Sequence, residues 1–255
     1  MERRFEGKVA LVTGAATGMG QATAARLAAD GATVAVNHLP GQDPEQTLAR
    51  ISSSNGQGFA IPADMRAPDQ VTAMVHEVAQ RAGRLDYVVS NAGINPTLTW
   101  DNTSVEDFDR LFETNVRGTW VVATEAAKQM IHEGHGGAIC FVSSISAHVG
   151  APYQTAYCGT KGAISMLAKA LACNLGEHGI RVNAVEPGWT KTPMSAAIQD
   201  DPAVLKYYEE RIPLHRGAQP EELAAAITFL LSGDASYVTA ATLLVDGGFT
   251  VNAEL

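Results

Sequence analysis

KVALVTGAATGMGQATAARLAADG, residues 8–31 of this 255-residue chain, combines a strand pattern, a glycine loop and a helix pattern. Lys8–Thr13 is a short apolar run with β-branched residues, which predicts a strand buried in a parallel sheet. Gly14, Gly18 and Gly20 follow, and an alanine-rich helix then runs to Gly31. Glycines in this place permit a tight turn and let the backbone approach a pyrophosphate at the helix N-terminus. The stretch therefore predicts nucleotide binding.

Strand and helix patterns alternate along the rest of the chain, which predicts an α/β doubly wound sheet in a single domain. We see no repeat, linker or low-complexity tract in it. Residues 190–216 contain three prolines and are expected to form a mobile flap over the pocket. The strands are predicted at 32–36, 58–62, 86–90, 138–143, 180–186 and 242–246, and the helices at 44–54, 68–83, 105–131, 155–178 and 220–232.

Composition and charge exclude several classes of protein. The 18 Lys and Arg against 27 Asp and Glu leave a net charge of −9, which argues against a nucleic-acid or anionic membrane surface. No apolar run is long enough for a membrane span, and the first one is too short for a signal peptide. The three cysteines lack metal-ligand spacing. We expect a cytoplasmic protein with free thiols and no metal.

Two further predicted strand ends bear on nucleotide binding. Asn37 and His38 follow the second strand, where an Asp or Glu would bind the ribose of NAD. These two residues would not repel the 2′-phosphate of NADP. The Arg expected of a strong NADP site is missing. The pattern therefore favours NADP as cofactor but also tolerates NAD. Asp64 follows the third strand. Its carboxylate can accept from an adenine amino group or cap the next helix.

Tyr157 and Lys161 are the candidate proton-transfer pair. Their spacing places them on one face of the predicted helix 155–178, although an exposed helix could show the same pair by chance. A phenol has a pKa near ~10, and a fixed ammonium beside it favours the phenolate. Asn115, amid apolar residues of the segment 105–131, is disfavoured within a helix and would kink it or hold a water. Ser144 is delivered to the end of the strand 138–143.

Taken in order, these motifs resemble the short-chain dehydrogenase/reductase family over nearly the whole chain. The resemblance implies a Rossmann fold with a seven-stranded parallel sheet, a nicotinamide cofactor (NADP favoured, or NAD), and a homotetramer built through 105–131, 155–178 and 220–250. The matching motifs are TGAATGMG at 13–20, NAG at 91–93, Asn115, Ser144, YxxxK at 157–161, PG at 187–188 and VDGG at 245–248.

The resemblance also implies a catalytic tetrad. Ser144 would bind the substrate oxygen. Tyr157 would remove the proton of the substrate hydroxyl, and would act as the acid in the reverse direction. Lys161 would lower the tyrosine pKa and contact the nicotinamide ribose, while Asn115 would hold a water linking Lys161 to solvent. The candidate cofactor residues are Gly14, Thr17, Gly18, Met19, Gly20, Asn37, His38, Asp64, Met65, Asn91, Ala92, Gly93, Tyr157, Lys161, Pro187, Gly188, Thr190 and Thr192.

The substrate pocket is expected to be lined by 94–98, 144–154 and 189–212. The runs SSISAHVG…YQTAY and DGGFTVN look most like the sugar 1-dehydrogenases of the family, such as those for rhamnose or glucose, which oxidise the C1 hydroxyl of an aldose to a lactone. A polyhydroxylated substrate needs several polar partners, because its hydroxyls lose water on binding. If Gln154 does not bind the substrate, it lies at the rim of the pocket. If Trp189 does not bind it, its ring fills space at the end of the sheet. The candidate substrate residues are Ser144, Ser146, Gln154, Asn95 and Trp189.

Rival functions remain open. A 3-oxoacyl carrier-protein reductase would need basic residues at the pocket mouth to bind the acidic carrier protein. Arg211, His215 and Arg216 are the candidates and are weak support for this function. A reductase of another ketone is equally compatible. A non-catalytic NADP-sensing protein would not need the tetrad, and a methyltransferase would use the glycine loop but not the Tyr/Lys pair.

Overall fold

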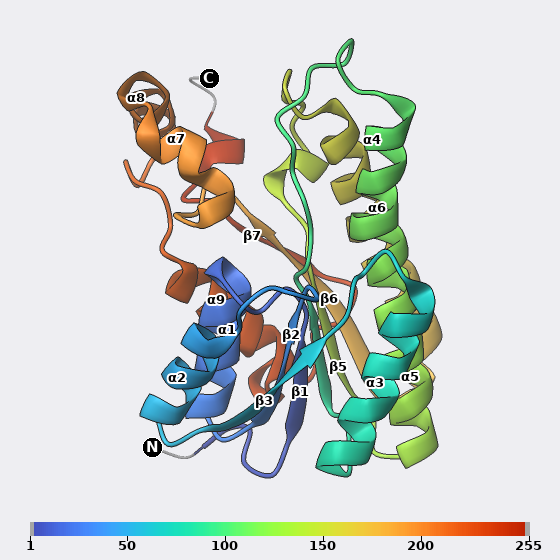
Figure 1. The fold of residues 1–255 in the computed structure, drawn as a ribbon. Coiled ribbons are helices and arrows are strands. Elements are labelled where there is room, and N and C mark those ends of the chain that lie inside the picture. Colours follow the sequence, from blue (N-terminus) through green and yellow to red (C-terminus); the bar gives the residue numbers. More distant parts are fainter. Residues whose placement is uncertain (1–2, 253–255) are drawn as a thin grey trace.

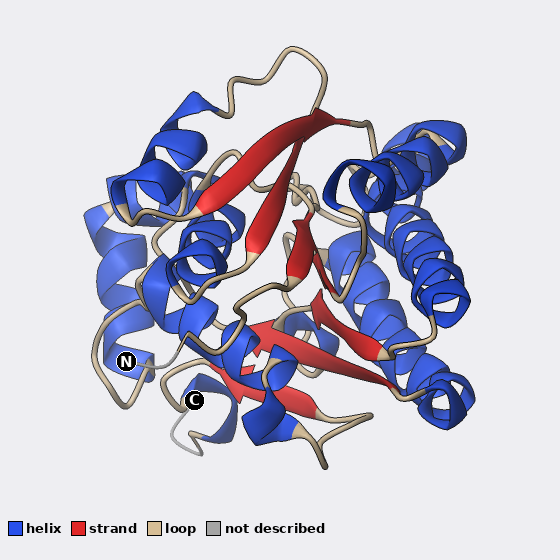
Figure 2. Ribbon diagram, turned by 90° about the horizontal axis from the view of Figure 1, so that it is seen from below, coloured by secondary structure: helices blue, strands red, loops and turns tan. Residues whose placement is uncertain are grey.

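A seven-stranded parallel sheet runs through the middle of the protein, with helices on both faces (Figures 1 and 2). The structure, a computed structural model, describes residues 3–252. The strand order is β3-β2-β1-β4-β5-β6-β7, with every neighbouring pair parallel. The predicted doubly wound sheet is therefore confirmed. The strands are β1 (Val9–Val12), β2 (Thr33–His38), β3 (Gln57–Pro62), β4 (Tyr87–Ser90), β5 (Gly137–Val142), β6 (Ile180–Pro187) and β7 (Thr242–Val245).

The helices divide between the two faces and the carboxyl end of the sheet (Figure 1). One face carries α1 (Gly18–Ala29), α2 (Glu45–Ser53) and α9 (Pro220–Leu231). The other carries α3 (Pro68–Ala82), α4 (Val105–Leu111), α5 (Gly118–Glu133) and α6 (Thr155–Leu175). The short helices α7 (Ala196–Asp200) and α8 (Pro202–Arg211) lie within the predicted flap. Across residues 3–252, no helix has the length and apolar character needed to cross a bilayer.

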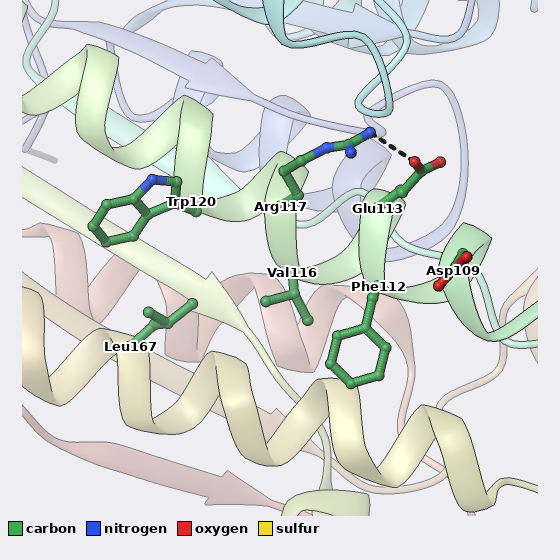
Figure 3. A pocket seen from close by; sticks show the side chains of 7 residues that line it. All are labelled: Asp109, Phe112, Glu113, Val116, Arg117, Trp120 and Leu167. Carbon is green, nitrogen blue, oxygen red and sulfur yellow. Dashed lines mark ion pairs between the residues drawn. The ribbon is translucent and has the colours of Figure 1, made fainter.

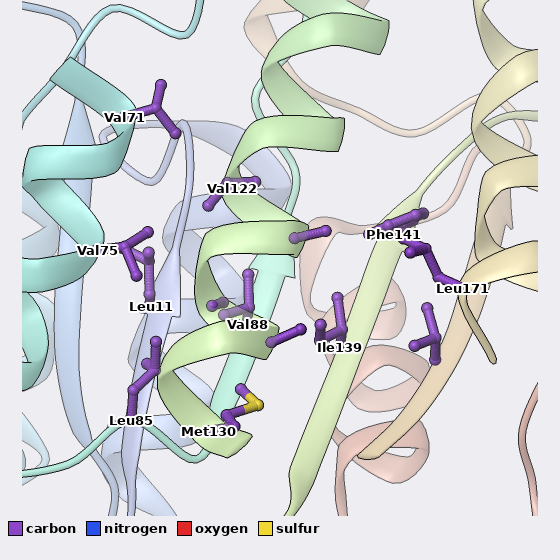
Figure 4. Close-up of a cluster of buried hydrophobic side chains, with 14 of the residues drawn as sticks. Leu11, Val71, Val75, Leu85, Val88, Val122, Met130, Ile139, Phe141 and Leu171 are labelled. Carbon is purple, nitrogen blue, oxygen red and sulfur yellow. The ribbon is translucent and has the colours of Figure 1, made fainter. Parts of the chain in front are cut away.

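Two apolar layers bury the sheet on both sides. Leu11 of β1 belongs to the layer under α3, α5 and α6, together with Ile139 and Phe141 of β5 (Figure 4). Its neighbour Val12 belongs to the layer under α1 and α9. Successive side chains of a strand point to opposite faces. Burial on both faces explains why these strands are continuous apolar runs in the sequence.

The structure forms the predicted helix 105–131 as one run of helical backbone with a π-helical turn inside it. This run consists of α4, a π-helical turn at Phe112–Arg117, and α5, which ends at Glu133. Asn115 lies in the π-helical turn with its side chain buried. Such turns are frequent at functional sites. Gly118 starts α5 against Met65, because a Cβ at Gly118 would lie 2.8 Å from the Met65 carbonyl oxygen. The side chain of Met65 is thus part of the core.

Candidate active site

The residues that the sequence singled out gather along the carboxyl edge of the sheet. Since all seven strands are parallel, the loops after them lie at the same edge, where doubly wound sheets bind their ligands. Three groups of residues can be distinguished there. They are the glycine turn after β1, a polar cluster formed by residues after β4 and β5 and on α6, and the segments after β6.

Two asparagine side chains hold the backbone of Gly14 from opposite sides. The Gly14 N–H donates to Asn37 Oδ1 at 3.1 Å, and the Gly14 carbonyl accepts from Asn91 Nδ2 at 3.1 Å. Thr13 adds a third contact, because its Oγ1 accepts from the backbone N–H of Ala92 at 3.0 Å. The strands β2 and β4 thereby fix the shape of the turn that precedes α1.

The glycine turn has the crowding of a pyrophosphate site and leads directly into a helix N-terminus. A Cβ at Gly20 would lie 2.4 Å from the Gly14 carbonyl oxygen and 2.6 Å from Asn91 Nδ2. Gly14 and Gly18 have φ angles of +60° and +58°, which side chains disfavour. The helix α1 begins here without an acidic residue in its first turn, so its N-terminus suits an anion. Thr17 precedes it, and its side chain caps no backbone group of the helix. These features fit a dinucleotide.

The candidate residues after β2 and β3 are largely engaged within the protein. Besides Gly14, Asn37 binds the carbonyl oxygens of Ile61 and Ala63 through Nδ2, both at 3.3 Å. Its hydrogen-bonding groups, which we assigned to the cofactor, thus brace the glycine turn. His38 Nδ1 lies 3.1 Å from the Leu39 carbonyl oxygen. The hydrogen bonds from Arg66 lower the pKa of Asp64.

Asn115 is also bound within the protein. Its Oδ1 accepts from the Ile94 N–H at 2.9 Å, and its Nδ2 donates to the Ile94 carbonyl at 3.0 Å and to Thr160 Oγ1 at 3.2 Å. These bonds leave no amide hydrogen free for the expected water. A Cβ at Gly93 would lie 3.2 Å from Asn115 Oδ1 and 3.9 Å from Lys161 Nζ, so these groups are neighbours.

Ser144, Tyr157 and Lys161 lie together in the buried part of the site. Ser144 hydrogen-bonds the phenol of Tyr157. Lys161 Nζ lies 5.3 Å from the centre of the Tyr157 ring and donates to the Val142 carbonyl at 2.9 Å. Asn115 joins this group through Thr160, the residue before Lys161. The structure therefore places all four predicted tetrad residues in one cluster.

Burial dominates the ionisation of the pair. It raises the pKa of Tyr157 to about 12, although the hydrogen bond from Ser144 acts in the opposite sense. It lowers the pKa of Lys161 to about 8. We expected Lys161 to lower the tyrosine pKa, but in the polypeptide itself desolvation outweighs any attraction between the two groups. Tyr157 is consequently a phenol at neutral pH, ready to donate a proton.

The segments expected around the substrate meet beside this cluster. The N–H of Leu98 donates to the Tyr153 carbonyl at 3.1 Å, and Ser146 Oγ donates to Gln154 Oε1 at 3.3 Å. Two buried polar atoms, Asn95 Oδ1 and Trp189 Nε1, have no hydrogen-bond partner within residues 3–252. Buried polar atoms are normally paired. These two are therefore candidates for ligand contact.

After β6, the chain returns to the glycine turn. A Cβ at Gly188, which follows Pro187, would lie 2.8 Å from Asp246 Cα, so β6 and β7 end in close contact. Thr190 Oγ1 donates to the Gly188 carbonyl at 3.2 Å. Thr192 lies over Gly18, because a Cβ there would meet the Thr192 side chain at 3.3 Å. Trp189 packs between Gly217 and the ring of Tyr208, whose centre is 5.9 Å away.

The sequence reasoning missed one polar group at this edge. Glu186, inside the strand predicted at 180–186, is fully buried and binds His148 and Ser165. The available signal was an acidic residue directly after the apolar pair Ala184-Val185 of a predicted buried strand, because such a residue needs buried partners.

The chain belongs to the short-chain dehydrogenase/reductase family. A family model described as enoyl-(acyl carrier protein) reductase matches residues 14–250. The chain is 42% identical to an L-rhamnose 1-dehydrogenase (NAD(P)(+)) of Sphingomonas sp., covering 98% of this chain and 99% of that protein. It is 38% identical to an L-rhamnose-1-dehydrogenase of Scheffersomyces stipitis (98% of each) and 39% identical to a cyclopentanol dehydrogenase of Comamonas sp. (98% and 99%).

Solved structures agree with this assignment. A short-chain type dehydrogenase/reductase from Mycobacterium marinum superimposes with a TM-score of 0.92 at 36% identity over 98% of both chains. A gluconate 5-dehydrogenase from Burkholderia cenocepacia, in complex with NADP and tartrate, superimposes with a TM-score of 0.92 at 32% identity over 98% of both chains. The protein is therefore an oxidoreductase, and its relatives bind NAD(P).

A first prediction concerns the glycine turn. Gly20→Ala should weaken NADPH binding roughly ten- to hundred-fold, because the new methyl group overlaps the Gly14 carbonyl and displaces the turn. Titration of NADPH fluorescence measures the effect. Gly233→Ala is the control, since a Cβ there meets nothing within 4 Å. Equal affinity in both variants would contradict a pyrophosphate site at this turn.

A second prediction concerns the buried amine. Folding lowers the pKa of Lys161 from 10.5 to about 8, so the protonated amine opposes folding. The stability of the wild type relative to Lys161→Met should therefore rise between pH 8 and pH 10.5, by on the order of 3 kcal/mol. Tyr157 is present in both proteins, so its titration largely cancels. Urea unfolding at several pH values measures the difference, and parallel stability curves would contradict the prediction.

Proposed function

We propose that this protein oxidises the C1 hydroxyl of an aldose to the lactone, with NADP⁺ as the favoured cofactor and NAD⁺ accepted. The observation that carries the proposal is the set of polar groups on the segments that follow β4, β5 and β6. Ser146 and Gln154 lie next to Ser144, and Asn95 and Trp189 have buried polar atoms without a partner in the described chain. Relatives named L-rhamnose 1-dehydrogenase support a sugar substrate.

The proposed mechanism uses the residues clustered around Tyr157. When bound, the nicotinamide supplies the hydride acceptor. Ser144 holds the substrate oxygen through its hydroxyl, which already reaches the phenol of Tyr157. In reduction, the phenol of Tyr157 gives its proton to the substrate oxygen; in oxidation, Tyr157 takes the hydroxyl proton as the phenolate, after its own proton has left. Lys161 is fixed by the Val142 carbonyl and presents its positive charge near the phenol, which favours the anionic form as the proton leaves.

Four further side chains would orient the sugar. Ser146 Oγ and Gln154 Oε1 form one hydrogen-bonded pair whose remaining groups suit vicinal hydroxyls. Trp189 offers an indole N–H and Asn95 a carbonyl oxygen. A buried donor or acceptor left unpaired is costly, so a ligand that pairs both is preferred over one that does not.

The preference for NADP rests on the end of β2. His38 and Leu39 follow the engaged Asn37, so no carboxylate stands where it would repel a 2′-phosphate. Thr17 is exposed beside the glycine turn and offers a hydroxyl. The lack of an arginine among these residues supports the acceptance of NAD as well.

Other ketone or alcohol substrates are the second candidate, and the relationship to a cyclopentanol dehydrogenase favours it. The carrier-protein alternative has little support at the pocket mouth. Arg211 stacks on the Tyr207 ring at 3.7 Å, and Arg216 forms two hydrogen bonds of 2.7 Å with Glu222. Both cations are therefore already engaged. A non-catalytic sensor would leave the clustered tetrad unexplained.

The proposed enzyme is a homotetramer in the cytoplasm. Val105, Phe108, Trp120 and Met166 expose large apolar side chains on α4, α5 and α6. A groove of about 430 Å³ is lined by residues of α4, the π-helical turn and α5 and by Leu167 of α6, and its lining includes the Arg117–Glu113 ion pair (Figure 3). Such a face supports pairing through these helices. The free cysteines Cys140, Cys158 and Cys173 support a reducing compartment.

The reduction of NADP⁺ and NAD⁺, measured at 340 nm with aldoses, polyols, cyclic alcohols and secondary alcohols, tests the proposal. We expect turnover with aldoses above all and a lactone product. Tyr157→Phe should retain NADPH binding and lose roughly 10²–10⁴ in turnover, because only proton transfer is removed. Tyr237→Phe, at a fully exposed site, is the control. Activity confined to non-sugar alcohols would reject the aldose assignment.

A separate prediction concerns the pocket. Gln154→Ala should raise the KM for the sugar roughly two- to ten-fold, which corresponds to the loss of one hydrogen bond. Steady-state kinetics at saturating cofactor measure it. Gln129→Ala is the matched control, because Gln129 binds Glu133 at the last turn of α5. An unchanged KM would remove Gln154 from the proposed substrate ligands.

A further inference from the structure

Glu186 is a fully buried carboxylate that the proposed mechanism leaves without a role. It is the penultimate residue of β6, directly before Pro187 and Gly188. Its Oε2 lies 2.6 Å from His148 Nε2, and its Oε1 accepts from Ser165 Oγ at 2.6 Å. A buried carboxylate is tolerated when it is paired and hydrogen-bonded in this way.

The contacts of Glu186 continue to the helix that carries Tyr157 and Lys161. The hydroxyl oxygens of Ser165 and Ser143 lie 2.8 Å apart, and Ser143 Oγ lies 2.9 Å from the Lys161 carbonyl oxygen. Ser165 stands one helical turn beyond Lys161 on α6. Ser143 directly precedes Ser144. The carboxylate is therefore connected to both halves of the proposed catalytic cluster.

His148 connects the loop after β5 to the carboxylate of Glu186. It follows the 3₁₀ turn Ile145–Ala147, which Ser144 caps by accepting from the Ser146 N–H at 3.1 Å. The loop then runs through exposed residues, including Tyr153, to Gln154 at the start of α6. The imidazole side chain is 46% exposed, so it reaches from the surface to the buried acid. Its contact with Glu186 links this loop to β6.

We propose that His148 and Glu186 are positioning residues that fix the loop 145–154 against α6 and the end of β6. The inference rests on the proposed function, because it assigns substrate contacts to Ser144, Ser146 and Gln154. Charge-assisted hydrogen bonds fix direction as well as distance, whereas apolar contacts fix neither closely. A displacement of about 1 Å at a reacting group can cost roughly 10²-fold in rate. The pair therefore keeps the substrate hydroxyl in line with Tyr157.

Substitutions of His148 test this role. His148→Ala should lower kcat/KM for the substrate found in the screen by roughly ten- to hundred-fold, with the Kd for NADPH unchanged. His148→Gln should recover most of the loss, because the Gln amide nitrogen can occupy the place of Nε2 and donate to Glu186. His178→Ala is the matched control, since His178 is similarly exposed and lies 3.9 Å from the exposed Glu177.

Hydrogen exchange gives a readout that needs no substrate. Amides of residues 145–154 should exchange faster in His148→Ala, while those of β1 and α1 stay as in the wild type. If no aldose is oxidised, the aldose assignment fails, and this experiment still decides the positioning role. Unchanged exchange of the loop, unchanged kcat/KM in His148→Ala, or equal damage in His148→Gln would each overturn the proposal.

Discussion

The hydrogen bonds on the two sides of the Gly14 peptide are the constraint on which the carboxyl edge depends. Asn37 comes from β2 and Asn91 from β4, and β1 lies between these strands. The glycine turn can adopt its shape only when the three strands are in register. The turn also positions Gly20 and the first residues of α1. Thr192, which follows β6, lies against Gly18. Sheet pairing and nucleotide binding are thus parts of one arrangement.

The cluster around Tyr157 combines groups that are costly to bury. The desolvation that raises the tyrosine pKa and lowers the lysine pKa works against the stability of their charged forms. Surrounding polar contacts hold the geometry, with Lys161 on the Val142 carbonyl and Asn115 on both backbone groups of Ile94. Such a cluster is a common property of active sites, where stability is given up for reactivity.

The fold followed from the sequence because alternating apolar runs and glycine loops leave few other arrangements of a chain of this length. The Tyr157–Lys161 pair followed from helical spacing, and the addition of Asn115 and Ser144 followed from the family resemblance. Side-chain partners did not follow. Asn37 was assigned to the cofactor, since no periodicity indicates that its amide oxygen accepts from the Gly14 N–H after the neighbouring strand. Glu186 was overlooked for the same reason, because its partners come from a loop and a helix far away in the sequence.

The π-helical turn at Phe112–Arg117 has a geometric consequence for the helices around it. Each residue of an α-helix advances the chain by about 100° around its axis. One surplus residue therefore shifts the apolar stripe after the turn out of phase with the stripe before it. This lets α4 turn towards α6, while α5 turns towards α3 and the strands. A single run of chain thereby packs against α6 at its start and against α3 and the strands further on.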